Sequence, residues 1–164
     1  KPAFAKIGFH YNTDDFAKLA RPGELADDNY LIYLSAGKTI RHFDRSGQRY
    51  LQASFSYNYA PENRNVYHHE VTALARAIGP FAGRPNDELG IGLIAAFLSE
   101  DFSRASVTGG GASADTEVTV ELAYKAEITP WLILQPDLQF VLDPAGDDSR
   151  DPVWIAGFRT VIDF

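Results

Sequence analysis

The sequence predicts an all-β protein, an antiparallel transmembrane β-barrel with about eight strands in this chain. Three observations predict this class. Hydrophobic and polar residues alternate over most of the chain, the alternating stretches have the length of membrane-spanning strands, and polar loops separate them. Because successive side chains of a strand point to opposite faces of a sheet, each stretch has an apolar face and a polar face.

The first clear strand is predicted over residues 50–59, after weaker alternation over residues 3–12 and 29–40. A polar loop rich in Gly, Pro and Asp, residues 13–28, separates the two weaker stretches. One face of the clear strand carries Leu51, Ala53, Phe55, Tyr57 and Tyr59, and the other carries Gln52, Ser54, Ser56 and Asn58. The first face is therefore apolar and aromatic, and the second face is polar but uncharged.

The next two strands are predicted over residues 70–79 and 87–99. Residues 70–79 also fit a helical spacing of apolar positions, and we interpret them as a strand. Residues 90–95 match the loose form G-x-G-x-x-A of a dinucleotide-binding loop, but that motif needs a following helix. We interpret the glycines as small residues in a crowded strand.

The last three strands are predicted over residues 117–128, 132–140 and 153–164. Polar loops over 101–114 and 143–152 precede the first and the last of them, and Thr129-Pro130 forms a tight turn between the other two. Longer loops thus alternate with shorter turns, as on the two rims of an outer-membrane barrel, with residues 41–49 as an exception. An even number of strands puts both chain ends on one side.

The polar faces favour a membrane barrel over a soluble sheet. Burying Glu117, Glu121, Lys125 and Glu127 in a dry core would cost several kcal/mol for each unpaired ion, whereas a water-filled lumen hydrates them. We therefore expect the aliphatic faces to contact lipid and the aromatic residues near strand ends to form interfacial girdles. The alternatives are a soluble β-domain and a complete eight-stranded barrel with a structural or adhesion role and no channel.

Composition excludes several other classes. The formal net charge of −7 at pH 7 argues against nucleic acid as a partner. There is no Cys for disulfides or thiolate chemistry, and no apolar run is long enough for a transmembrane helix. The absence of Met, and a start at Lys1 with no leader pattern, predict that the chain was processed or cut from a longer protein.

We expect no catalytic residues, no metal and no cofactor. His68 and His69 are adjacent, so on a strand they point to opposite faces. The acidic residues of loop 143–152 lack the spacing of Ca²⁺ ligands. Ser54 or Ser56 with His10 has no local signature of a nucleophile and its base.

Two segments resemble the carbohydrate-selective porins, the OprB family. Residues 79–92 read GPFAGRPNDELGIG and are similar to that family's G-x-x-x-G-R-x-x-D-x-x-G-x-G segment. Residues 121–125 read ELAYK and residues 128–140 read ITPWLILQPDLQF, which together resemble its closing E-x-x-Y … W-x-x-L-Q-P-D-x-Q hairpin. The terminal Phe164 resembles the signal by which the barrel-assembly machinery recognises outer-membrane proteins.

This resemblance implies a role and a set of partners. It implies passive diffusion of sugars through an outer-membrane barrel of about sixteen strands, of which residues 1–164 would be the C-terminal half, a single barrel domain. The implied partners are sugars, outer-membrane lipid and lipopolysaccharide, the barrel-assembly machinery and further copies of the parent protein in a homo-oligomer.

The candidate pore-lining residues come from the polar faces. Their donors and acceptors suit sugar hydroxyls, and an aromatic ring, Trp131 or Tyr33, is suited to stack on a pyranose. The candidates are Arg76, Glu121, Trp131, Gln135, Asp137, Gln139 and Arg159, with Phe164 as the assembly signal. The alternative for each is that it only hydrates and braces the barrel wall.

Overall fold

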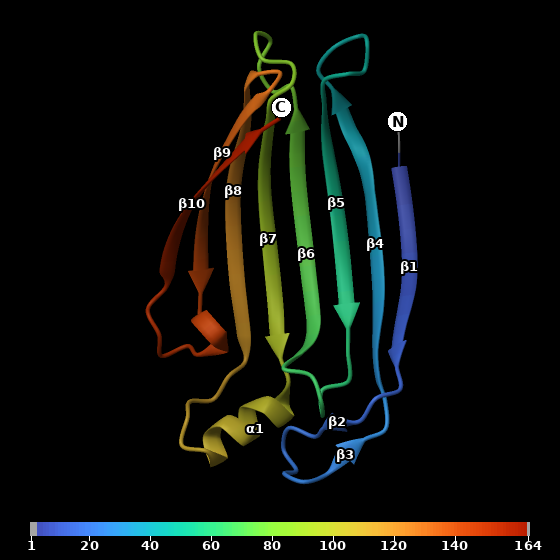
Figure 1. Cartoon of the computed structure of the whole chain (residues 1–164), viewed down its shortest axis with the longest axis vertical. Coiled ribbons are helices and arrows are strands. Elements are labelled where there is room, and N and C mark those ends of the chain that lie inside the picture. Colours follow the sequence, from blue (N-terminus) through green and yellow to red (C-terminus); the bar gives the residue numbers. More distant parts are fainter. Residues whose placement is uncertain (1–2, 164) are drawn as a thin grey trace.

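An eight-stranded antiparallel sheet makes up most of the protein in the computed structural model, which describes residues 3–163. Its strand order is β1-β4-β5-β6-β7-β8-β9-β10, so each strand pairs with the next one of the sheet along the chain (Figure 1). The strands are β1 (Ala3–Asn12), β4 (Asn29–His42), β5 (Tyr50–Tyr59), β6 (Tyr67–Ile78), β7 (Glu88–Leu98), β8 (Thr116–Thr129), β9 (Leu132–Leu142) and β10 (Val153–Ile162). The predicted all-β class and all eight predicted strands are confirmed.

Strand β6 shows why the ambiguous segment is not helical. It is paired along its length with β5 on one side and β7 on the other, for example Ala75 with Ala53 and with Ile91. Two ladders satisfy the backbone donors and acceptors of a central strand on both sides. This tertiary pairing overrides the local helical spacing.

The connections gather on two rims. The loop rim consists of residues 13–28, 60–66, 99–115 and 143–152, and the turn rim consists of residues 43–49, 79–87 and 130–131. The loop rim also holds β2 (Phe16–Ala17), β3 (Leu25–Ala26), α1 (Glu100–Thr108) and the 3-10 helix η1 (Pro144–Gly146). Strand β1 begins and strand β10 ends toward the turn rim, as the even strand count predicted (Figure 1).

Helix α1 corrects the expectation of an irregular loop over residues 101–114. Ser99 caps the helix by accepting a hydrogen bond from the Phe102 amide at 3.0 Å, and Glu100 and Asp101 lie in the first turn. A hydroxyl cap followed by acidic residues is favourable at a helix N-terminus. Within residues 3–163, no helix is both long enough and apolar enough to cross a membrane.

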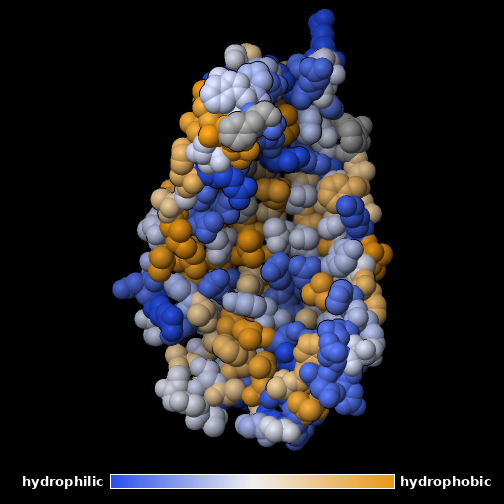
Figure 2. Space-filling model, in the orientation of Figure 1, coloured by the Kyte–Doolittle hydropathy of each residue, from blue (hydrophilic) through white to orange (hydrophobic). Residues whose placement is uncertain are grey.

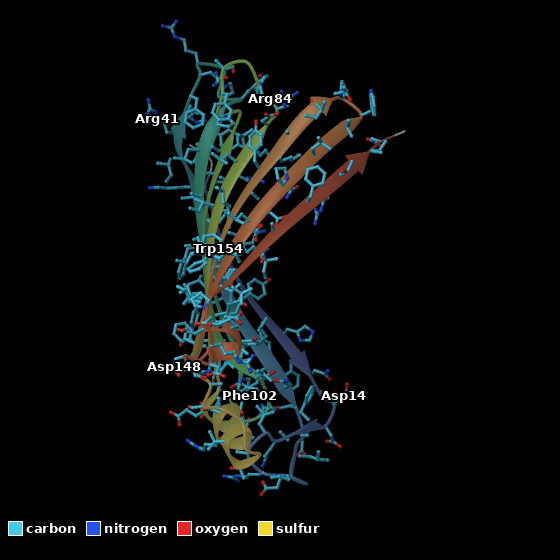
Figure 3. All side chains as sticks on the ribbon, turned by 90° about the vertical axis from the view of Figure 1, so that its left-hand side faces the viewer. Asp14, Arg41, Arg84, Phe102, Asp148 and Trp154 are labelled. Carbon is cyan, nitrogen blue, oxygen red and sulfur yellow. The ribbon has the colours of Figure 1, made fainter. Side chains whose placement is uncertain are left out.

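The sheet is curved but does not close. Over the described residues β1 pairs only with β4, and β10 pairs only with β9. Strands β1, β9 and β10 curve to the same side of the central strands in Figure 3. The chain therefore forms an open, curved sheet with one convex and one concave face.

Strand register separates apolar from polar side chains across the whole sheet. One row of cross-strand neighbours is apolar in all eight strands: Ala5, Ala36, Phe55, Ala73, Leu93, Val120, Phe140 and Trp154. Large side chains of this apolar face are strongly exposed, including Ile7 at 80% and Phe158 at 66%. An apolar surface that extends over every strand indicates contact with lipid and not with water.

Candidate functional site

The polar face of the sheet is the candidate site. We define it by Gln52, Ser54, Ser56 and Asn58 of β5 and their register neighbours on the same side of the other strands. A cavity of about 200 Å³ on this face is lined by Thr72, Leu74, Gly90, Gly92, Ile94, Thr119, Glu121 and Ala123 of β6, β7 and β8. All of these lining residues belong to the polar face, which is therefore the concave side. Figure 2 looks into the concave side, where hydrophilic residues are interspersed with apolar ones.

A chain of charged and polar groups crosses four strands of the polar face. Arg76 donates to Gln52 Oε1 at 3.5 Å, and its other terminal nitrogen lies 3.5 Å from Glu88 Oε2. Lys125 Nζ donates to Glu88 Oε1 at 3.0 Å. Because these groups are partly exposed, the pairs add little to stability. They do place several hydrogen-bonding groups side by side on a hydrated wall.

Two further hydrogen bonds lie nearer the loop rim on the same face. Asn58 donates from Nδ2 to Glu70 Oε1 at 2.9 Å, and Gln139 donates from Nε2 to Glu121 Oε2 at 3.3 Å. Each bond uses only one of the two oxygens of the carboxylate, Oε1 of Glu70 and Oε2 of Glu121. Such oxygens are acceptors for a hydroxyl that enters the concave side.

The structure brings most of the predicted pore-lining residues onto one face. Register places Arg159 directly opposite Gln135, and Asp137 opposite Gly157. A Cβ on Gly157 would lie 2.4 Å from the carboxylate oxygens of Asp137, so the glycine leaves room for this side chain. Arg76, Glu121 and Gln139 share the polar face with these residues. Their role toward sugars stays a prediction.

Two predicted residues lie elsewhere. Trp131 occupies the turn between β8 and β9 with 55% of its surface exposed, so it lies at the turn rim and not within the wall. Its carbonyl accepts a hydrogen bond from the Asp163 amide at 3.0 Å. Phe164, the predicted assembly signal, lies outside the described residues.

The interpretation of Gly90 and Gly92 as residues in a crowded strand is wrong. No atom lies within 4 Å of where a Cβ of Gly90 would be, and the nearest for Gly92 is Leu74 Cδ1 at 3.9 Å. The glycines instead form the floor of the concave cavity. Sequence alternation shows which face a glycine belongs to, but not whether the space above it is filled.

Sequence reasoning assigned no role to Asp87, which is the centre of a buried cluster at the turn rim. Its carboxylate is 1% exposed and accepts hydrogen bonds from the Arg84 guanidinium, the Tyr124 hydroxyl and, at 3.0 Å, the Glu127 amide. Burial by itself would raise the pKa of Asp87, but these hydrogen bonds and the charge of Arg84 lower it below its ordinary value. The Arg-x-x-Asp spacing within a Gly- and Pro-rich turn was the available signal.

No metal site is evident in the part of the chain that the structure describes. Residues 3–163 contain no group of three or more His, Asp or Glu side chains placed to hold an ion. Asp147 of loop 143–152 instead accepts hydrogen bonds from the Ser149 hydroxyl at 2.5 Å and from Arg150 at 2.9 Å.

The protein is similar to two proteins named as porins. Porin QuiX of Acinetobacter baylyi is 22% identical over 186 residues, covering 99% of this chain and 40% of that protein. Porin B of Pseudomonas aeruginosa is 29% identical over 94 residues, covering 49% of this chain and 21% of that protein. The chain therefore spans less than half the length of these relatives.

The fold matches a solved structure. The high-pH structure of Pseudomonas putida OprB superposes with a TM-score of 0.88 at 20% identity, covering 98% of this chain and 44% of that chain. The family model "Carbohydrate-selective porin, OprB family" matches residues 5–164, which is nearly the whole chain. On this match the chain belongs to the OprB family of carbohydrate-selective porins.

Proposed function

We propose that this chain forms one half of the wall of a water-filled outer-membrane pore through which sugars diffuse passively. The observation that supports this most strongly is the division of one curved sheet into a convex face that is apolar in every strand and a concave face that carries the polar and charged side chains. A sheet with these two faces separates lipid from water. No covalent step, and so no enzyme activity, is part of this function.

The other half of the wall would come from further strands of the same protein. The edge strands β1 and β10 do not pair with each other over residues 3–163, and the chain covers only 40% to 44% of two of its relatives. Unpaired strand edges are not tolerated inside a bilayer. The open sheet therefore argues against the alternative of a complete eight-stranded barrel, and favours residues 1–164 as one portion of a single larger barrel domain.

The chemistry of the concave face suits neutral polyols. Arg76 and Lys125 share Glu88, so one of their two positive charges is compensated, while amides and carboxylate oxygens remain able to bond to hydroxyls. Uncharged sugars need many hydrogen bonds and no net charge match. Outer-membrane lipid and lipopolysaccharide would contact the convex face, and the barrel-assembly machinery and a homo-oligomer complete the proposed set of partners.

Current block by sugar in planar bilayers tests this function. In the full-length protein, Arg159→Ala or Gln139→Ala should weaken sugar binding by roughly 1–2 kcal/mol, the contribution of a hydrogen bond to a charged or amide group. Both side chains lie on the concave face of neighbouring strands. The control Asp147→Ala changes a side chain that bonds within its own loop and should do little. Unchanged sugar affinity in both test variants would mean that Arg159 and Gln139 serve only as barrel wall.

A further inference from the structure

The aromatic ring of Tyr33 lies flat on the concave wall near the loop rim. Tyr33 of β4 pairs with Gly8 of β1, and a Cβ on Gly8 would meet Tyr33 Cζ at 2.1 Å and Cε1 at 2.2 Å. The ring therefore occupies the space that a side chain at Gly8 would take. One side of the ring covers the β1 backbone, and Tyr33 still has 38% of its surface exposed.

The exposed side of this ring has no stacking partner in the described part of the chain. Among residues 3–163, no aromatic ring and no cation stacks on Tyr33. Phe4 provides the contrast on the same face, because its ring lies over Gly37 but Lys6 Nζ is 5.6 Å from its centroid. The ring of Phe4 thus has a cation on it already, whereas that of Tyr33 is open.

Hydrogen-bonding groups continue from Tyr33 along the same register row. Tyr33 pairs with Asn58 of β5, which pairs with Glu70 of β6. Neighbouring strands are about 4.8 Å apart, so the row extends over about 10 Å from the ring to the carboxylate. The Asn58–Glu70 bond at 2.9 Å uses one amide hydrogen and one carboxylate oxygen. Asn58 Oδ1 and Glu70 Oε2 remain as acceptors for hydroxyls.

A small cavity adjoins the far end of this row. It has a volume of about 110 Å³, and Asn58, Glu70 and His68 are among its lining residues. The Nδ1 atom of His68 is buried and has no hydrogen-bond partner among residues 3–163. A buried polar atom without a partner carries a free-energy cost that a bound hydroxyl would remove.

From these observations we infer that Tyr33, Asn58 and Glu70 form a subsite for a pyranose ring, with Tyr33 stacking on its C–H face and the row binding its hydroxyls. This inference rests on the proposed function and adds to it a preference for cyclic sugars over open-chain polyols. A flat aromatic surface favours a cyclic sugar over an open-chain polyol with comparable hydroxyls, because only the ring presents a flat apolar face. Hydrogen bonds alone would not distinguish the two.

The test compares methyl α-D-glucopyranoside with D-glucitol as blockers of ion current through the full-length protein in planar bilayers. The wild type should bind the pyranoside more tightly. Tyr33→Ala should raise the Kd of the pyranoside by roughly fivefold to tenfold and leave that of the glucitol unchanged. Tyr33→Phe, which keeps the ring, should retain the preference, and so should the matched control Phe4→Ala.

Two other outcomes would contradict either the Tyr33 subsite or sugar binding by the pore. If Tyr33→Ala keeps the wild-type preference, or Phe4→Ala removes it equally, the subsite is overturned while the sugar pore stands. If neither compound blocks the wild-type channel, sugar binding by the pore is itself overturned. Tyr33→Leu, which keeps an apolar side chain over Gly8, replaces the alanine variant if that variant does not fold, and the same loss of preference is expected.

Discussion

At the scale of single residues, the side chains that are most deeply buried are polar. Within residues 3–163 the largest side chains that are fully buried are those of Asp87 and Ser99, one at each rim. A wall one strand thick cannot enclose a side chain, because each residue faces either lipid or lumen. Full burial occurs at Asp87, in a turn that bonds to β8, and at Ser99, the cap of α1. There a polar side chain can satisfy the backbone groups that the ladder leaves unpaired.

The first prediction concerns Asp87 and pH. Since the pKa of the folded-state carboxyl is lowered, its ionised form stabilises the protein above the unfolded pKa of about 3.9, and this contribution is lost as pH falls through the lower, folded pKa. Asp87→Asn should reduce the free energy of unfolding by about 1–3 kcal/mol at neutral pH, and the difference from wild type should shrink in acid. Urea titration of the full-length protein at a series of pH values measures both effects.

The exposed Asp148 supplies the control for this prediction. Asp148→Asn lies in a loop on the opposite rim and should leave the unfolding curves unchanged at every pH. A constant difference between Asp87→Asn and wild type from neutral pH down to strong acid would contradict the role assigned to the ionised carboxylate.

At the scale of elements, the turns of the turn rim are bonded to one another. Arg49, which precedes β5, donates from Nε to the carbonyl of Gly79 at 2.8 Å, and Gly79 opens the turn that carries Arg84 and Asp87. Gly79 has φ +58, and a Cβ there would lie 2.7 Å from Pro85 O. The segment 41–49 was unusually long for a turn on this rim. Strand β4 extends to His42, and the remaining residues bring Arg49 to its partner.

The second prediction tests the two faces of strand β8. Leu122 lies on the convex face and Thr119 on the concave face of this strand. Leu122→Arg should cost about 2–4 kcal/mol of folding free energy in bilayers, because a charge is then exposed to hydrocarbon. Thr119→Arg places the same side chain toward water and should cost much less. Equal costs for the two variants, measured by reversible unfolding in lipid vesicles, would contradict the orientation of the sheet.

At the scale of the whole molecule, the protein is a curved sheet without a large internal core. The few buried hydrophobic residues of the described chain are mostly alanines, with Leu98 and Val141. Strand pairing and contact with lipid must therefore provide most of the stability. The outer-membrane localisation predicted from the sequence agrees with this architecture and is confirmed by membership of the OprB family.

The third prediction follows from the unpaired edges. Residues 1–164 produced alone should not yield a compact, heat-modifiable barrel in detergent, because β1 and β10 would expose backbone donors and acceptors. On the proposed larger barrel, adding its further strands should restore the compact form. Electrophoresis with and without heating distinguishes the two states. A compact and heat-modifiable species from residues 1–164 alone would instead support the small eight-stranded barrel.

The sequence by itself determined the number of strands, their approximate bounds and the composition of their two faces. Strand alternation is a local property, because the direction of each side chain depends only on its place in the extended backbone. The division of β5 into Gln52, Ser54, Ser56 and Asn58 against its aromatic side could therefore be predicted. The family motifs in turn indicated a porin, which the match over residues 5–164 confirms.

The tertiary structure alone decided which polar residues meet. Glu88 and Lys125 are far apart in the sequence, as are Tyr33, Asn58 and Glu70, and a shift of one residue in register would separate each set. Register depends on turn geometry and on pairing with both neighbouring strands, which alternation does not encode. For the same reason the space above Gly90, the partners of Asp87 and the open side of Tyr33 became visible only once the strands were paired and the sheet was curved.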